Sequence, residues 1–240
     1  MCIRDRDIMD LMTISGLIIG LSATSYVMWK GGIFYLLFNI DAAILVIGGT
    51  IGATLITYPW KIIRQAFIAL WMVFFPQKKE TPAKIIRMMV ELAERAKTSG
   101  IHSLAEANPD KHNNFLKDGL QMLVDDLEAD IIRDNMEKDI TFIRRRHQQI
   151  GNVFRTMGTY APIFGLLGTL IGVVQVLRNL TDPQSMGRSM AIAVTTTFYG
   201  IFLTNFVFLP IAGKLNSHTE DELLIKEVII EGLLAIQKGD

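Results

Sequence analysis

Apolar residues gather in four long runs along the chain, and the charged residues lie between these runs and after the last of them. An α-helix needs roughly 20 apolar residues, with a range of about 17–25, to cross a bilayer, and each run reaches or approaches that length. We therefore predict four membrane-spanning helices. Their expected limits are residues 11–29, 42–58, 160–177 and 190–211.

The links between the runs predict how these helices pair. Links 30–41 and 178–189 are short, so the two runs on either side of each link are expected to form a helical hairpin. Lys61, Arg64 and Arg155 lie close to span ends and belong to the long middle segment. Because an excess of Lys and Arg near span ends marks the cytoplasmic side, we place the middle segment and both termini in the cytoplasm.

The predicted fold class is an all-α membrane protein, with four transmembrane helices in two hairpins, a large helical cytoplasmic domain between them and a helical C-terminal tail. Met9 directly precedes the first run and offers a second start, so residues 1–8 are interpreted as a non-native extension. The expected divisions are a cytoplasmic N-terminus at 1–10, transmembrane helices 1 and 2 at 11–58, the cytoplasmic domain at 59–156, transmembrane helices 3 and 4 at 157–211, and a cytoplasmic tail at 212–240.

The middle segment and the tail show helical spacing. Residues 62–75 are apolar with Arg64 on one side, and they are too short and too charged to span, so an interfacial helix is expected there. The other expected helices are 81–99, 116–127, 130–149 with a break at Gly151, and 220–237 in the tail.

Composition excludes several kinds of site. The formal net charge is zero, which gives no argument for a nucleic-acid partner. Cys2 is the only cysteine, so an intrachain disulfide and a cysteine metal cluster are both excluded. The four histidines lack metal-ligand spacing, and the Gly-rich stretch 165–172 follows no strand as a nucleotide loop would. We predict no enzyme activity, no cofactor and no bound metal.

The third and fourth runs contain polar groups that a simple membrane anchor would not need. Pro162 has no N–H, which frees the carbonyl of Gly158, and Pro210 does the same to Phe206. Small residues recur at intervals of three or four, a pattern that lets two helices approach closely. In the third run they are Gly165, Gly168, Thr169 and Gly172, and in the fourth Thr197, Gly200 and Thr204, with Thr195 and Thr196 beside them.

Two interpretations of these groups stay open on spacing alone. They serve helix packing only, with each hydroxyl bonding back to its own helix, or they line a passage for a hydrated proton or Na⁺, which prefer hard oxygen donors. The four runs hold no Asp, Glu, Lys, Arg or His between their ends. An ion carrier usually keeps such a group. The chain therefore either moves no ion or takes its carboxylate from a partner. Asp41, at the outer end of the second run, is expected to cap that helix.

The order of these elements resembles the MotA/PomA family of flagellar stator subunits, within the wider group that includes TolQ and ExbB. The resemblance covers nearly the whole chain from Met9. It rests on a series of segments in a fixed order: MDLMTISGLIIGLSA, VIGGTIGATLITYP, FLKDGLQMLVDD, RRRHQQIG, YAPIFGLLGTLIGVVQVL and MAIAVTTTFYGIFLTNFVFLPIAGKL.

The resemblance implies a flagellar motor stator in the bacterial inner membrane. Such subunits form a ring, expected to be a pentamer among membrane lipids, around a single-span partner of the MotB or PomB type. The partner binds peptidoglycan and supplies an aspartate. Flow of H⁺ or Na⁺ past that aspartate turns the ring, and the cytoplasmic domain pushes the rotor switch complex.

The resemblance also implies roles for particular residues. Pro162 and Pro210 match two prolines tied to torque coupling. Thr169, Thr196 and Thr197 match hydroxyls placed near the ion path, and Thr169 stands where sodium-type stators have threonine, which favours Na⁺. Lys97 matches a basic rotor contact. Glu106 lies one residue beyond the expected acidic contact, where this chain has Ala105.

Two alternatives accompany this hypothesis. The first is a TolQ/ExbB-type ion-driven energiser of outer-membrane processes. Those relatives have a single span before the cytoplasmic block, so the two runs found here favour the stator. The second is a non-conducting membrane scaffold, in which the polar residues of the spans serve packing alone.

Overall fold

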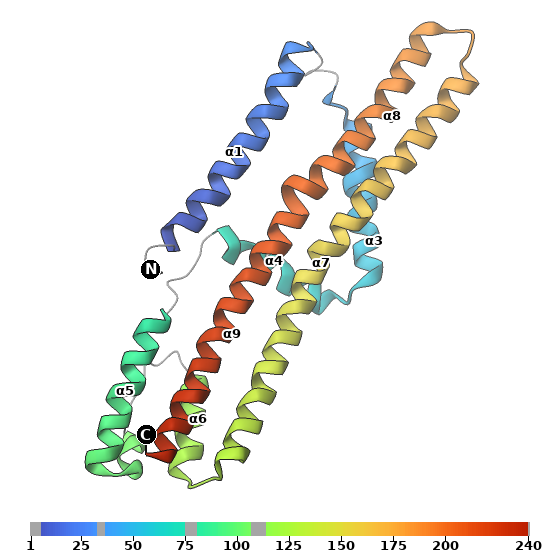
Figure 1. Cartoon of the computed structure of the whole chain (residues 1–240). Helices are drawn as coiled ribbons and strands as arrows, with labels where there is room; N and C mark the ends of the chain where they lie inside the picture. Colours follow the sequence, from blue (N-terminus) through green and yellow to red (C-terminus); the bar gives the residue numbers. More distant parts are fainter. Residues whose placement is uncertain (1–5, 33–36, 75–80, 107–113, 240) are drawn as a thin grey trace. The chain divides into compact units, whose positions relative to one another are not determined.

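The computed structural model describes residues 6–32, 37–74, 81–106 and 114–239, with the side chains of residues 6–14, 72–74 and 106 outside the description. Every regular element in these ranges is helical (Figure 1), which confirms the predicted all-α class. In the labels, η marks a π-helix or a 3₁₀-helix. The elements are α1 (Arg6–Lys30), α2 (Ile40–Ala43), η2 (Ile44–Gly48), α3 (Gly49–Thr57), α4 (Trp60–Phe74), α5 (Pro82–Ser99), η3 (Ile101–Glu106), α6 (Asn114–Val124), α7 (Ala129–Arg178), α8 (Pro183–Leu203), η4 (Thr204–Phe208) and α9 (Leu209–Lys238).

The chain forms two compact units, and the long helix α7 contributes to both. Unit 1 comprises residues 1–63 and 153–210, and unit 2 comprises 64–152 and 211–240. Three helical stretches in the described chain are long and apolar enough to cross a membrane. They are Ile40–Thr57, Ala129–Arg178 and Pro183–Lys238.

These stretches contain the third and fourth predicted spans and the second except for its last residue, Tyr58, whereas the first predicted span lies within α1. The first side chains of α1 are outside the described residues. The division into four spans and two hairpins, and the domain limits drawn from it, stay predictions.

Helix α7 corrects the expected break at Gly151, because it runs without interruption from Ala129 to Arg178. A glycine inside a helix costs only about 1 kcal/mol relative to alanine. Val153 and Phe154, two and three residues further on, are buried, and their packing offsets that cost. Helix α9 likewise begins at Leu209, well before the expected start of the tail helix.

The start of α2 corrects the expected cap at Asp41. Asn39 is the N-cap residue, and its side-chain oxygen accepts a hydrogen bond of 3.1 Å from the Ala42 N–H. Asp41 lies inside the first turn, where a negative charge is still favourable beside the positive end of the helix dipole. The capping signal was therefore present in the sequence, two residues earlier than expected.

Helix α8 begins at a well-defined cap. Asp182 is the N-cap residue and Pro183 takes the first helical position, where its missing N–H costs nothing. The Ser185 hydroxyl and the Gln184 backbone amide donate to the carboxylate, which holds the pKa of Asp182 below its usual value. The turn before this cap lets α8 return alongside α7 (Figure 1).

Hydroxyl groups tie three helical segments of unit 1 together. At the end of α3, the Tyr58 hydroxyl lies 2.8 Å from the Thr156 hydroxyl of α7. One residue earlier, the Thr57 hydroxyl lies 3.0 Å from that of Tyr160. At the other end, Tyr199 of α8 donates to the Leu37 carbonyl and accepts from the N–H of the capping Asn39. The stretch from α2 to α3 is thus bonded to α8 at its start and to α7 at its end.

Unit 2 has its own hydrophobic core, formed where α5, α6, α7 and α9 meet. Its fully buried side chains include Ile85 of α5, Leu116 of α6, Met136 of α7 and Leu233 of α9. Burying a side chain of this size contributes roughly 1.5–3 kcal/mol. The core therefore holds together helices that are far apart in the sequence.

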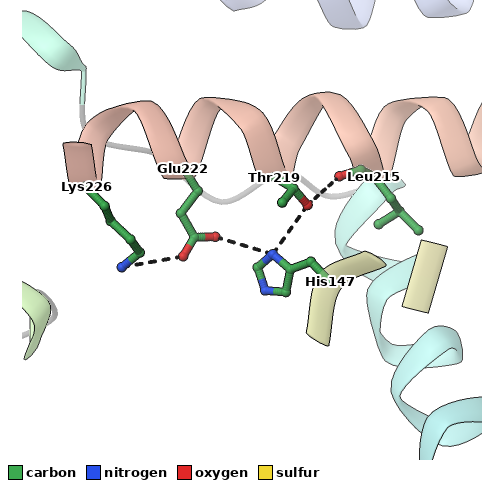
Figure 2. A network of polar contacts seen from close by, with 5 residues as sticks. All are labelled: His147, Leu215, Thr219, Glu222 and Lys226. Atoms are coloured by element: carbon green, nitrogen blue, oxygen red, sulfur yellow. Dashed lines mark hydrogen bonds and ion pairs between the residues drawn. The ribbon is translucent and has the colours of Figure 1, made fainter. Parts of the chain in front are cut away.

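A polar network supplements this core between α7 and α9 (Figure 2). The Thr219 hydroxyl donates to the Leu215 carbonyl at 2.9 Å and lies at hydrogen-bond distance, 3.3 Å, from Nδ1 of His147. Glu222 lies 3.9 Å from the same nitrogen and 3.7 Å from Nζ of Lys226. Lys226 also lies 4.5 Å above the centroid of the Phe115 ring, which joins α6 to the network.

Candidate functional site

Helices α7 and α8 approach each other closely along the predicted stripe of small residues. A Cβ atom placed on Gly165 would lie 2.9 Å from the Thr196 carbonyl oxygen, and one on Gly200 would lie 2.6 Å from the Ala161 carbonyl oxygen. Gly168 and Gly172 would meet Thr196 and Ala193 side-chain atoms, each at 2.5 Å. Even one methyl group would collide at these positions, so glycine is required for this packing.

Four oxygen atoms lie close together on this stripe, two from threonine hydroxyls and two from backbone carbonyls. The hydroxyls of Thr169 and Thr197 hydrogen-bond to each other. Thr169 Oγ1 also lies 3.2 Å from the Gly165 carbonyl oxygen and 3.1 Å from that of Ala193. Thr197 Oγ1 lies 3.4 Å from each of these two carbonyls. We call these two hydroxyls and two carbonyls the oxygen cluster.

The third predicted ion-path residue, Thr196, lies beside the oxygen cluster rather than in it. Its side chain is fully buried against Gly168, and its hydroxyl donates to the Ala193 carbonyl at 2.9 Å. Thr195 is also buried and donates to Ala191 at 2.7 Å. The structure therefore brings Thr169 and Thr197 together through their hydroxyls, whereas Thr196 shares only the Ala193 acceptor with them.

The carbonyl freed by Pro162 has a partner on the neighbouring helix. The Thr204 hydroxyl donates to the Gly158 carbonyl at 3.0 Å and shares its proton with the Gly200 carbonyl at 2.9 Å. Thr204 is buried. Because a buried, unpaired carbonyl is costly, this hydroxyl helps to explain why α7 continues past a proline. The sequence pattern had marked Thr204 only as one of the small groups of the fourth run.

The second proline, Pro210, lies near the start of α9, which directly follows a π-helix. The π-helix η4 ends at Phe208, and the N–H of Leu209 bonds to the Thr204 carbonyl, five residues back. A π-turn widens the helix locally, and such turns occur where the regular bonding ladder is interrupted. Pro210 itself is exposed. The two predicted torque-coupling prolines thus lie in different helices. A threonine hydroxyl bonds the carbonyl freed by Pro162, whereas a π-helix precedes Pro210.

The predicted rotor-contact residues lie in unit 2. Lys97 is exposed in the last turn of α5, where a positive charge is favourable beside the helix C-terminus. Gly100 ends this helix with φ +82°, a conformation that residues with side chains rarely adopt. Glu106 is the last residue of η3, and its side chain lies outside the described residues.

The oxygen cluster can interact with a hard cation or a hydrated proton through oxygen atoms alone. Within the described ranges, no group of three or more His, Cys, Asp or Glu side chains is placed to hold a metal ion. The predicted spans themselves contain no carboxylate between their ends. This site therefore offers neutral oxygen ligands alone.

Comparison with known proteins places these features in a family. A family model described as the MotA/TolQ/ExbB proton channel family matches residues 107–227. The chain is 37% identical over 238 residues to the chemotaxis protein PomA of Vibrio alginolyticus, covering 96% of this chain and 90% of that protein. It is 34% identical over 232 residues to motility protein A of Bacillus subtilis, covering 96% and 86%.

Two solved structures have the same fold over most of their length. The structure of C. jejuni MotAB is matched with a TM-score of 0.88 and 26% identity, covering 96% of this chain and 90% of that one. The flagellar MotAB stator complex from Bacillus subtilis is matched with a TM-score of 0.85 and 34% identity, covering 96% and 89%.

Proposed function

The chain belongs to the MotA/TolQ/ExbB proton channel family, and we propose that it is a flagellar motor stator subunit. With a MotB-type partner it forms an ion channel that converts ion flow into torque on the rotor. The observation that carries this proposal is similarity over nearly the whole chain to motility proteins and to MotAB stator structures. These relatives do not favour the outer-membrane energiser considered from the sequence.

The geometry of unit 1 supports a division of labour between two polypeptides. The oxygen cluster supplies neutral ligands on the α7–α8 pair, and the partner, of the MotB or PomB type, supplies the carboxylate that changes charge as the ion passes. One elementary charge crossing 100 mV releases about 2.3 kcal/mol. Each ion therefore delivers a small push, and rotation requires many of them.

The remaining features of the assembly belong to the same proposal. The chain is a membrane protein, as its family and its apolar helices indicate. We infer an inner-membrane location with four spans in two hairpins and cytoplasmic termini. Five copies surround a peptidoglycan-binding partner among membrane lipids, and unit 2 contacts the rotor switch complex through Lys97 and Glu106. Pro162 and Pro210 couple ion passage to torque.

The direct test of this function is complementation of motility. The full chain is expressed together with a MotB-type single-span partner, in a bacterium that lacks its own stator genes. We expect swimming in soft agar only when both proteins are present. If both proteins reach the membrane and the cells stay immotile, the stator assignment is wrong.

Replacing Thr169 by alanine removes one hydroxyl from the oxygen cluster. A loss of about 1.4 kcal/mol in ion binding corresponds to a tenfold weaker affinity, so swimming should require about tenfold more Na⁺ if Na⁺ is the coupling ion. Swimming speed is measured against Na⁺ concentration at constant ionic strength. Thr169→Ser keeps the hydroxyl and should keep the wild-type curve. Wild-type swimming of Thr169→Ala in both Na⁺-rich and Na⁺-free medium excludes a role of this hydroxyl in the ion path.

Replacing Lys97 by glutamate reverses an exposed charge at the end of α5. We expect most of the swimming to be lost while the amount of protein in the membrane stays unchanged, because a charge at an interface steers the encounter rather than the fold. Lys117→Glu makes the same charge change on α6, also at an exposed position, and should leave swimming intact. Full motility of Lys97→Glu removes this residue from the rotor contact.

A further inference from the structure

Helix α4 presents an exposed face on which three large aromatic side chains surround one cation. Trp60, Phe67 and Trp71 are 71%, 63% and 69% exposed, and Arg64 is exposed between them. Their spacing of four, three and four residues places all four on one side of the helix. Ile63 and Ala66, which point elsewhere, are buried. The exposed face thus carries three large aromatic side chains, against the usual pattern of a water-facing helix.

The position of α4 in the chain keeps this face close to the membrane. Helix α3 ends at Thr57 as part of a stretch apolar enough to cross a bilayer, and α4 begins at Trp60. Tyr58 is extended, so α4 does not continue the axis of α3. With only Tyr58 and Pro59 between the helices, α4 has to begin no more than about 11 Å from the end of a membrane helix.

The charge of α4 indicates which lipids it would meet. Lys61 and Arg64 are its only charged residues, and the helix contains no Asp or Glu. Tryptophan concentrates at the level of lipid headgroups, and arginine extends its charged end to that level while its stem stays in apolar surroundings. A basic residue near an anionic membrane surface gains roughly 1 kcal/mol.

We infer that the exposed face of α4 is a binding surface for anionic phospholipid headgroups. Trp60, Phe67 and Trp71 enter the headgroup region, and Lys61 and Arg64 bind lipid phosphates with a net negative charge. This inference requires only that the chain is a membrane protein, and it holds whichever ion the stator uses. Each cation is expected to raise the local occupancy of anionic lipid about fivefold at low salt.

Tryptophan fluorescence tests this surface in the full-length protein. The chain has three tryptophans, Trp29, Trp60 and Trp71, so in Trp29→Phe all tryptophan emission comes from α4. This variant is reconstituted in phosphatidylcholine nanodiscs that contain the same fraction of either dibromo-phosphatidylglycerol or dibromo-phosphatidylcholine. Because bromine quenches only nearby rings, we expect stronger quenching by the brominated phosphatidylglycerol.

Charge variants in the Trp29→Phe background give the matched comparison. Lys61→Gln with Arg64→Gln should remove the excess quenching by phosphatidylglycerol, and high salt should reduce it. Arg145→Gln with Arg146→Gln removes the same charge from exposed positions of α7 and should leave the excess intact. Both lipids are compared in one protein, so a folding defect does not imitate selectivity.

Two results overturn the inference. Equal quenching by the two brominated lipids shows that α4 meets lipid without selecting anionic headgroups. No quenching by either lipid shows that protein covers this face. Swimming is scored separately on the same variants, so a chain that complements motility but fails the quenching test contradicts the lipid surface alone.

Discussion

Replacing Gly200 by alanine is expected to abolish swimming. The added Cβ would lie 2.6 Å from the Ala161 carbonyl oxygen and 3.0 Å from the Cα of Pro162. Both are backbone atoms, so only a separation of α7 from α8 relieves the collision. Forcing extra atoms into a packed interface typically costs about 1–3 kcal/mol. The separation would also move Thr197 away from Thr169 and open the oxygen cluster. The measurement is colony spread in soft agar, together with the thermal midpoint of the purified complex.

The same substitution at Gly187 provides the control. Gly187 lies on α8 as well, and a Cβ at this position would meet no atom within 4 Å. In both variants alanine gains up to about 1 kcal/mol in helix propensity over glycine. Cells that carry Gly187→Ala should therefore swim normally, and the thermal midpoint of the purified complex should be unchanged or slightly raised. Normal swimming of Gly200→Ala would mean that α7 and α8 are not packed as closely as described.

Replacing Thr204 by valine should destabilise the protein by about 1–3 kcal/mol, since it leaves the buried Gly158 carbonyl without a donor. Valine has nearly the shape of threonine, so the change removes a hydrogen bond without creating a large cavity. Thr204→Ser keeps the hydroxyl and should retain most of the stability. The free energy of unfolding, or the thermal midpoint of the purified protein in detergent, reports the loss.

A second substitution tests whether Pro162 is the reason why stability depends on the Thr204 hydroxyl. Pro162→Ala restores an N–H that can donate to the Gly158 carbonyl in the ordinary helical pattern. In that background, Thr204→Val should cost clearly less than it does in the wild-type chain. The four proteins form a double-mutant cycle, and the coupling should exceed about 0.5 kcal/mol, as expected for groups in one hydrogen-bond network. Additive effects would show that the threonine does not compensate for the proline.

The apolar runs predicted much of the fold. Length and hydrophobicity predicted helix at 42–58, 160–177 and 190–211, and apart from Tyr58 these residues lie within the apolar helical stretches Ile40–Thr57, Ala129–Arg178 and Pro183–Lys238. The small residues of the third and fourth runs predicted a close helix pair, and Gly165 and Gly200 do meet the neighbouring backbone. Such predictions succeed because lipid leaves few solutions to backbone hydrogen bonding.

Where prediction failed, the deciding partner was remote in the sequence or the choice was between neighbouring residues. Gly151 signals a helix end locally, yet packing of the residues after it carries α7 onward. Asn39 and Asp41 are both competent caps, and spacing alone did not separate them. The bond between Thr204 and Gly158 joins residues 46 positions apart, so only the folded chain reveals it.

The hydroxyl bonds at both ends of the α2–α3 stretch have a mechanical consequence. Tyr199 bonds its start to α8. At its end, Tyr58 bonds to Thr156 of α7 and Thr57 bonds to Tyr160 of α7. A twist of α7 near Pro162 would have to stretch these bonds or carry the other helices along. Packed elements joined in this way shift as a block rather than bend independently. Under the proposed function, an ion that reaches Thr169 would therefore act on a braced frame, and all the helices of that frame would share the resulting movement.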